Sequence, residues 1–357
     1  MRLFRLWALA CLALCVTVST GRAQAPAPRL IDNVEAAFAG IQVDGEHLTA
    51  RSNGLIPKPR YRVSLRNWFG LLNHFQGIQR IPFTDYVVIS GSNPRGGTAD
   101  LFVARMTPGE EGEVVRRVEV DPLMWHAGGL SVMNTILAVP LHQLSPRQAK
   151  IVFFDFADPL NPRKLPVEIA RPDRKAGSVA ITDLPNGRVL VAVLSAFDGL
   201  PRRLDFYLSR TSSITDGFMP EPASWRGSEV HARAGLEATF SYFQSINFVR
   251  QSDGRLFLAG FNNSFASPAI LPGRDYADLY EVVFPQSSML TSGSPATLAV
   301  PDVTRIASHR LNCKDGFCNM DAAAGLFVDP VSRSLSVYAM PGWLDGDTVK
   351  ATVYRGR

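Results

Sequence analysis

The sequence lacks the clustered basic residues that nucleic-acid-binding proteins use. Its 37 Lys and Arg exceed its 32 Asp and Glu by only five, and the basic pairs at 116–117, 174–175 and 202–203 stand apart from one another. Binding to nucleic acid requires Lys and Arg gathered on one face, so we expect no nucleic-acid partner. Beyond the N-terminal region, no apolar run approaches the roughly 20 residues of a membrane-spanning helix, so we expect no transmembrane anchor in the mature chain.

Cysteine is also scarce. Cys11 and Cys15 lie near the N-terminus, and the other two, Cys313 and Cys318, lie close together in NCKDGFCNMD. In an exported chain this spacing predicts one local disulfide. So small a loop removes little entropy from the unfolded chain, so the bond should shape a loop more than hold the fold. A zinc site would need two more ligands, of which His309 is the only obvious candidate, and we expect no metal or other cofactor.

The first 23 residues have the layout of a secretory signal peptide. Arg2 and Arg5 form a positive region, residues 6–18 are almost wholly apolar, and Gly21 and Ala23 are the small residues that a signal peptidase reads. Cleavage after Ala23 would lower the net charge from +5 to +2. We therefore predict that the protein is periplasmic or secreted. We also expect it to be a monomer.

Five stretches repeat one order of features, although no long amphipathic helix is evident. Each begins with a short segment of small residues, which we call the opening, and a first strand. A polar turn, a strongly apolar second strand, a loop and a third strand follow. A repeat of about 40–50 residues with three or four strands is typical of a β-propeller blade. A β-sandwich also uses short strands, but it does not need the same opening in every unit. We predict an all-β propeller of five blades, with six as the alternative; the openings are His74, His126, Lys175, Tyr242 and Ala322.

The propeller is predicted to span residues 61–357, preceded by an N-terminal segment at 24–60. The stretch FAGIQVDGEHLTAR, at 38–51, could supply an outer strand to the last blade and close the ring. A sixth blade could use RYRVSLRNWFGLL, at 60–72.

One stretch resembles a known family. AKIVFFDFADPLNPRKL, at 149–165, is similar to the LVIVD repeat, a bacterial propeller-type motif with an apolar strand, an Asp and an Asp-Pro-x-Asn-Pro turn. The matching residues are Asp155, Asp158, Pro159, Asn161 and Pro162. The resemblance covers one blade clearly and implies a propeller fold and export, but no reaction. In such a turn the prolines end the strand, while Asp and Asn bond to nearby backbone.

The repeat also predicts where polar side chains gather. The first strand of a propeller blade lines the central channel, so residues at the openings should meet around one mouth. His74, His126, Lys175 and Tyr242 would then surround it, with Gln76 and Gln244 nearby. Lys175 would supply charge and the others hydrogen bonds for an anion or a polar small molecule. Alternatively, these side chains join blade to blade. Residues without bulk would let the innermost strands approach closely; they are Gly77, Gly128, Gly129, Gly177, Ser178, Ser245 and Gly325.

The function that these observations favour is a binding module whose channel mouth and long loops hold an unknown small molecule or protein. The alternative is a hydrolase or lyase, with or without a metal, that uses His74, His126 and a carboxylate such as Asp85 or Asp321. No Gly-x-Ser-x-Gly sequence is present, and no complete catalytic group is evident. The sequence therefore leaves open whether the protein is an enzyme.

Overall fold

The structure is a computed structural model that describes residues 30–57, 74–93, 98–143, 148–195, 202–264, 274–285, 298–314 and 316–356. The predicted signal peptide at 1–23 and the candidate sixth-blade segment at 60–72 lie outside these residues. The described part is almost entirely β-strand. It contains one short α-helix, α1 (Val34–Ala39), and two 3-10 turns, η2 (Ile214–Asp216) and η3 (Gly227–Glu229). None of the described helices is long and apolar enough to cross a membrane.

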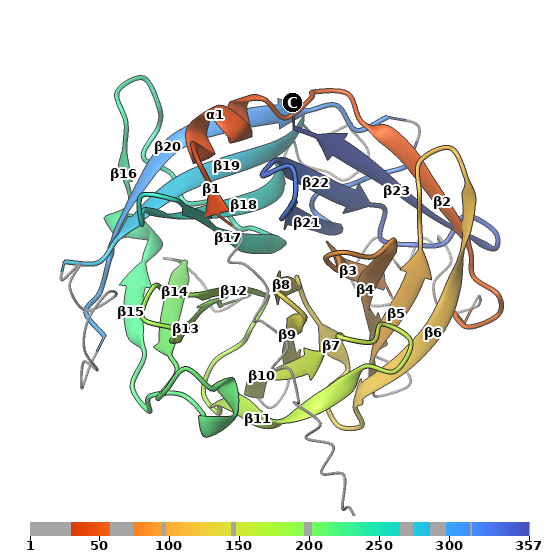
Figure 1. The fold of residues 1–357 in the computed structure, drawn as a ribbon, viewed down its shortest axis with the longest axis horizontal. Helices are drawn as coiled ribbons and strands as arrows, with labels where there is room; N and C mark the ends of the chain where they lie inside the picture. The colour runs from red at the N-terminus through yellow and green to blue at the C-terminus, as the bar shows by residue number, and fades with distance from the viewer. Residues whose placement is uncertain are drawn as a thin grey trace, which may run out of the picture.

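The described strands form five blades around a common centre (Figure 1). Blade 1 contains β3 (His74–Arg80), β4 (Tyr86–Asn93), β5 (Thr98–Arg105) and β6 (Glu111–Asp121). Blade 2 contains β7 (His126–Ala127), β8 (Ser131–Met133), β9 (Ile136–Gln143), β10 (Gln148–Asp155) and β11 (Arg163–Arg171). Blade 3 contains β12 (Ser178–Asp183), β13 (Val189–Leu194), β14 (Arg203–Leu208) and β15 (Ala223–Arg226).

Blade 4 contains β17 (Ser245–Gln251), β18 (Leu256–Ser264), β19 (Arg274–Val283) and β20 (Asp302–Leu311). The short strands β1 (Leu30–Ile31) and β16 (His231–Ala232) pair in parallel with its inner and outer strands, respectively. Blade 5 contains β21 (Ala323–Val328), β22 (Leu335–Met340), β23 (Thr348–Arg355) and, as its outer strand, β2 (Glu46–Arg51). The prediction of an all-β propeller with five blades is confirmed.

Strand β2, which precedes the first blade in the sequence, joins the last blade to the first. It pairs antiparallel with β23, where Leu48 lies opposite Ala351, and its end runs parallel to β6, where Ala50 lies opposite Gly112. A strand from before the first blade thus supplies the outer strand of blade 5, beside the C-terminal strand β23 (Figure 1). The boundaries predicted for the N-terminal segment and the propeller remain predictions.

The hydrophobic core lies between the blades. Each of five buried clusters takes its side chains from two neighbouring blades. In β18, for example, Leu258 belongs to the cluster shared with blade 3, whereas its neighbours Phe257 and Ala259 belong to the cluster shared with blade 5. Successive side chains of a strand point to opposite faces, and both faces of a blade are covered. This explains why the second strands are apolar at nearly every position.

The innermost strands approach one another closely, as their small residues predict. A side-chain carbon on Gly128 would lie 1.8 Å from the carbonyl oxygen of Gly177, and one on Gly129 would lie 2.2 Å from that of Gln244. Backbone bonds link these edges directly, since the Gly129 amide donates to Gly177 O at 2.9 Å. The centre of the propeller is therefore largely filled by strand edges.

The turn that resembles the LVIVD repeat connects β10 to β11. Asp155 accepts a hydrogen bond from the Ala157 amide at 3.0 Å, and Asp158 accepts one from the Leu160 amide at 2.9 Å. The side chain of Asn161 donates to the second oxygen of Asp158 at 2.8 Å. The motif residues thus stabilise their own turn, which is a structural role.

Candidate functional site

We call the end where the innermost strands begin the entrance end, and the end where they finish the exit end. Two of the predicted site residues, His74 of β3 and His126 of β7, come together at the entrance end, with ring centroids 5.9 Å apart. His142, at the end of β9, lies opposite His126 in the strand register, and their ring centroids are 4.0 Å apart. Two neighbouring blades therefore bring three imidazoles into contact.

His126 is the most buried polar group of the predicted mouth whose bonding is incomplete. His126 is 7% exposed, and its Nδ1 has no hydrogen-bond partner among the described residues. Burial lowers the pKa of His126 well below its usual value, and the charges of His142, His74 and Lys175 lower it further. The imidazole is therefore neutral near pH 7, and its Nδ1 is a buried polar atom without a hydrogen-bond partner among the described residues.

Lys175 is nearly buried, at 7% exposed, and it acts electrostatically on His126. Its backbone carbonyl accepts a hydrogen bond from Arg171 at 3.1 Å, which fixes the chain just before β12. Tyr242 is half-buried, and the guanidinium carbon of Arg202 lies 4.6 Å from its ring centroid. Lys175 is thus close to the imidazoles, and Tyr242 makes a cation–π contact with Arg202.

The two predicted glutamines bond to each other. Gln244, just before β17 of blade 4, donates through its side-chain amide to the side-chain oxygen of Gln76 in β3 of blade 1. Blades 1 and 4 are not neighbours, so this bond crosses the centre of the propeller. These two residues follow the alternative that the sequence left open, in which polar side chains join blade to blade.

Sequence reasoning missed His142. Its Nδ1 lies 2.7 Å from the Ala176 carbonyl oxygen, which can only accept, so Nδ1 carries the proton and donates to blade 3. The residue lies at the end of an apolar second strand, ILAVPLHQ, rather than at an opening. The signal that could have identified it is the antiparallel register, which sets the last residues of the second strand opposite the first residues of the inner strand.

The two carboxylates considered for the enzyme alternative lie in different places. Asp85 follows β3 in the hairpin at the exit end and pairs with Arg80 at 3.2 Å. His74 begins the same seven-residue strand, so about 20 Å separates the two ends. Asp85 is therefore wrong as a partner for His74. Asp321 precedes β21 at the entrance end. Among the described residues, no group of three or more His, Cys, Asp and Glu is arranged to hold a metal ion.

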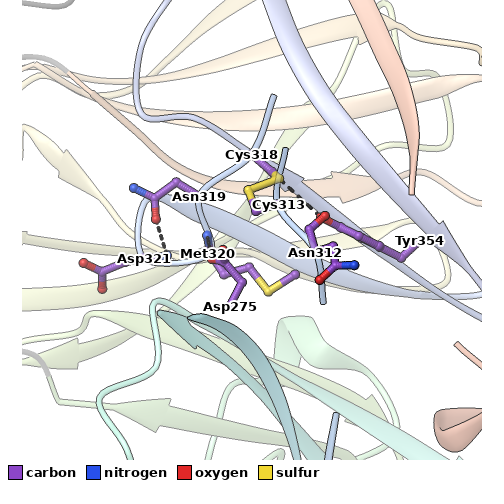
Figure 2. The surroundings of a disulfide bond; sticks show 8 residues. All are labelled: Asp275, Asn312, Cys313, Cys318, Asn319, Met320, Asp321 and Tyr354. Atoms are coloured by element: carbon purple, nitrogen blue, oxygen red, sulfur yellow. Dashed lines mark hydrogen bonds between the residues drawn. A yellow bond between two sulfur atoms is a disulfide. The ribbon is translucent and has the colours of Figure 1, made fainter. Parts of the chain in front are cut away.

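The predicted disulfide between Cys313 and Cys318 is present, with the two Cα atoms 5.5 Å apart (Figure 2). The Sγ of Cys318 lies 3.2 Å from the hydroxyl of Tyr354, which donates to Asn312 O at 2.9 Å. On the other side, the amide of Met320 donates to Asp275 at 2.9 Å (Figure 2). The crosslinked loop is thus packed between β23 and the start of β19.

Asp275, which is buried, and Asp321, which is half-buried, form a pair of carboxyls behind this loop. Burial raises the pKa of Asp275 to about 6. Burial and the charge of Asp275 together raise that of Asp321 to about 6. A carboxyl whose pKa is higher in the folded than in the unfolded protein binds more protons when folded, so stability is lost as the pH rises through that pKa.

Replacing Asp321 with Asn should therefore stabilise the protein at pH 8 but not at pH 4. Urea unfolding at the two pH values should show a gain of about 3 kcal/mol at pH 8 only, since the pKa of Asp321 is raised by about two units and each unit corresponds to about 1.4 kcal/mol. Asp173→Asn, at an exposed position, is the matched control. An equal effect of Asp321→Asn at both pH values would contradict the prediction.

Comparisons with known proteins give no family. No protein-family model matches the sequence, and no curated protein matches it. Among solved structures, a hypothetical protein from Leishmania major is 10% identical over 80% of this chain and 86% of its own, with a TM-score of 0.42. An alpha-L-arabinanase from Penicillium chrysogenum is 10% identical over 87% of this chain and 97% of its own, with a TM-score of 0.41. A thermostable family-43 glycoside hydrolase is 9% identical over 79% and 89%, with a TM-score of 0.43.

Proposed function

We propose that this protein is an exported binding module that holds a small anion at the entrance end of its propeller. The observation that carries the proposal is the unpartnered, buried Nδ1 of the neutral His126, which lies within the electrostatic influence of Lys175. A buried polar atom without a partner costs free energy, which a ligand would recover. A lysine supplies the positive charge that an anion needs.

The arrangement of the other mouth residues supports binding more than catalysis. Gln76 and Gln244 bond to each other, and His142 bonds to backbone, so these three side chains build a rigid floor. A rigid, preformed floor reduces the entropy lost on binding.

We also propose that the protein is of the LVIVD-repeat type and is located in the periplasm or outside the cell. The disulfide between Cys313 and Cys318 supports this location, because such bonds persist in oxidising compartments. The self-bonded turn at Asp155 and Asp158 supports the family type.

Inorganic phosphate should raise the melting temperature of the purified mature protein, and calorimetric titration should give a saturable affinity. His126→Ala and Lys175→Gln should each weaken that affinity at least about tenfold, since hydrogen bonds to charged groups contribute about 1.5–3 kcal/mol. His231→Ala removes an exposed histidine from β16 and should change nothing. Equal phosphate affinity in all four proteins, or no binding of phosphate or sulfate by the wild type, would refute the proposal.

Measuring the metal content of the purified protein distinguishes the enzyme alternative from the binding proposal. Near-stoichiometric metal in the wild type, lost in the His74→Ala/His126→Ala double variant, would mean that the two histidines share a metal site. The anion proposal would then be replaced by a hydrolase or lyase acting at the same end of the propeller.

A further inference from the structure

A cavity lies at the exit end, on the opposite side of the filled centre from the histidines. Its volume is about 30 Å³, which is room for one or two water-sized groups. It is lined by residues from the middle and the end of the innermost strands of blades 2 to 5, among them Ser131, Asp183, Asn247 and Arg250. In the innermost strand β17 (Ser245–Gln251), the lining residues run from Asn247 to Arg250, so the cavity begins about 7 Å along the strand and reaches about 17 Å.

The hydroxyl of Ser131 accepts two hydrogen bonds and, within the described part of the chain, donates none. Its oxygen accepts two hydrogen bonds at 3.2 Å, from the amide of Ile181 and from the side chain of Asn247. A serine hydroxyl has two acceptor positions and one donor. Both acceptor positions are filled, and no acceptor for the O–H occurs among the described residues. Ser131 is 1% exposed, so this donor is buried beside the cavity.

The floor that holds Ser131 is fixed from four blades. The side-chain oxygen of Asn247, in blade 4, accepts from the Leu326 amide of blade 5 at 3.0 Å, while its nitrogen donates to Ser131 of blade 2. Ile181 adds the donor from blade 3. A donor held by this network cannot turn to another partner without breaking bonds between blades.

Arg250 supplies the positive charge of the cavity. Its side chain is 11% exposed, and one terminal nitrogen lies 3.1 Å from a carboxylate oxygen of Asp183. Within the described part of the chain, this ion pair is the one polar contact of the Arg250 guanidinium. A guanidinium has five N–H donors in a planar fork suited to a carboxylate, so several remain for a ligand.

We propose that this exit-end cavity binds the carboxylate group of a small organic acid. One carboxylate oxygen accepts from the Ser131 hydroxyl and the other from Arg250, with the rest of the ligand directed to solvent. The cavity has room for about two oxygens, which matches the two oxygens of a carboxylate. The charge agrees, since Asp183 balances the charge of Arg250, so the site offers hydrogen-bond donors without net positive charge and suits a singly charged carboxylate better than a phosphate dianion.

Fluoroacetate tests the proposal, because its fluorine NMR signal reports weak binding directly. The wild-type mature protein should broaden and shift this signal saturably, and acetate should displace it whereas phosphate should not. Arg250→Gln and Ser131→Ala should each weaken binding at least about tenfold. Arg333→Gln is the matched control, because Arg333 is exposed, lies in the β21–β22 hairpin at the same end and pairs only at the surface, with Asp32.

Melting temperatures of all variants separate lost binding from lost folding. Should Ser131→Ala unfold, Arg250→Gln still tests the cavity. No saturable binding by the wild type, or wild-type affinity in Arg250→Gln, would overturn the proposal. Loss of fluoroacetate binding in Lys175→Gln alone would assign the carboxylate to the entrance end instead, so the two proposals can fail separately.

Discussion

Replacing Asp205 with Ala is expected to lower the free energy of unfolding by about 3–5 kcal/mol, because it leaves a buried arginine without its counter-charge. Asp205, in β14, is fully buried and lies 2.8 Å from Arg171, whose side chain is 1% exposed. Arg174 at 2.9 Å and Arg203 at 3.0 Å contact its other oxygen. Arg171 also donates to the hydroxyl of Tyr207 at 2.8 Å, so the network spans the outer part of blades 2 and 3.

Urea unfolding at pH 7 measures the loss, and Asp32→Asn is the control. Asp32 and Arg333 are exposed, at 67% and 60%, so removing this pair should cost no more than about 1 kcal/mol. A loss at Asp205 as small as the loss at Asp32 would show that the buried arginine is stabilised in another way.

The effect of Asp205→Ala should depend on pH. Burial alone would raise the pKa of Asp205, but Arg171, Ser224, Arg174 and Arg203 outweigh burial and lower it. A carboxyl whose pKa is lower in the folded protein contributes stability above its unfolded pKa, and this contribution is lost as the pH falls through the folded pKa. The difference between wild type and variant should therefore shrink below about pH 4.

The fold was predictable because each blade repeats one local pattern. The turns PNGR and SDGR place Gly187 and Gly254 at positive φ, 80° and 94°, where glycine is favoured. The five openings each precede or begin an innermost strand. Both kinds of signal are local, so a single sequence contains them.

The candidate sites were less predictable because they depend on which blades face each other across the centre. The bond between Gln76 and Gln244 crosses from blade 1 to blade 4, and that between Ser131 and Asn247 crosses from blade 2 to blade 4. No sequence spacing encodes such pairs. Asp85 was a possible carboxylate for the enzyme alternative, and only the structure shows that it lies at the other end of β3 from His74.

The sequence also could not predict which charged side chains are buried. Arg250 and Asp183 look like ordinary charges at the ends of strands, yet Arg250 is nearly covered and lines a cavity. Whether a strand end is buried depends on how closely five strands converge, and that follows from glycines in neighbouring blades rather than from the charged residue itself.

Removing residues 1–52 is expected to abolish cooperative folding, whereas removing residues 1–29 is expected to leave it intact. The larger deletion removes β2, whose Leu48 and Ala50 are buried between blades 5 and 1, and α1, whose Val34 and Phe38 are buried between blades 4 and 5. Each large buried side chain contributes about 2–5 kcal/mol. Their combined loss, with the backbone pairing of β2 to β23, is comparable to the 5–15 kcal/mol that stabilises a typical domain.

Thermal unfolding, monitored by circular dichroism, distinguishes the two shortened chains. A second experiment adds a synthetic peptide of residues 30–57 and decides the role of β2. Adding this peptide to the 53–357 chain should restore a cooperative transition, because β2 adds to blade 5 through backbone pairs that need no covalent connection to β3. A 53–357 chain that melts cooperatively at the wild-type temperature without the peptide would show that the ring closes without β2. The strand would then be a surface addition, and the contacts between blades 5 and 1 would suffice to hold the propeller together.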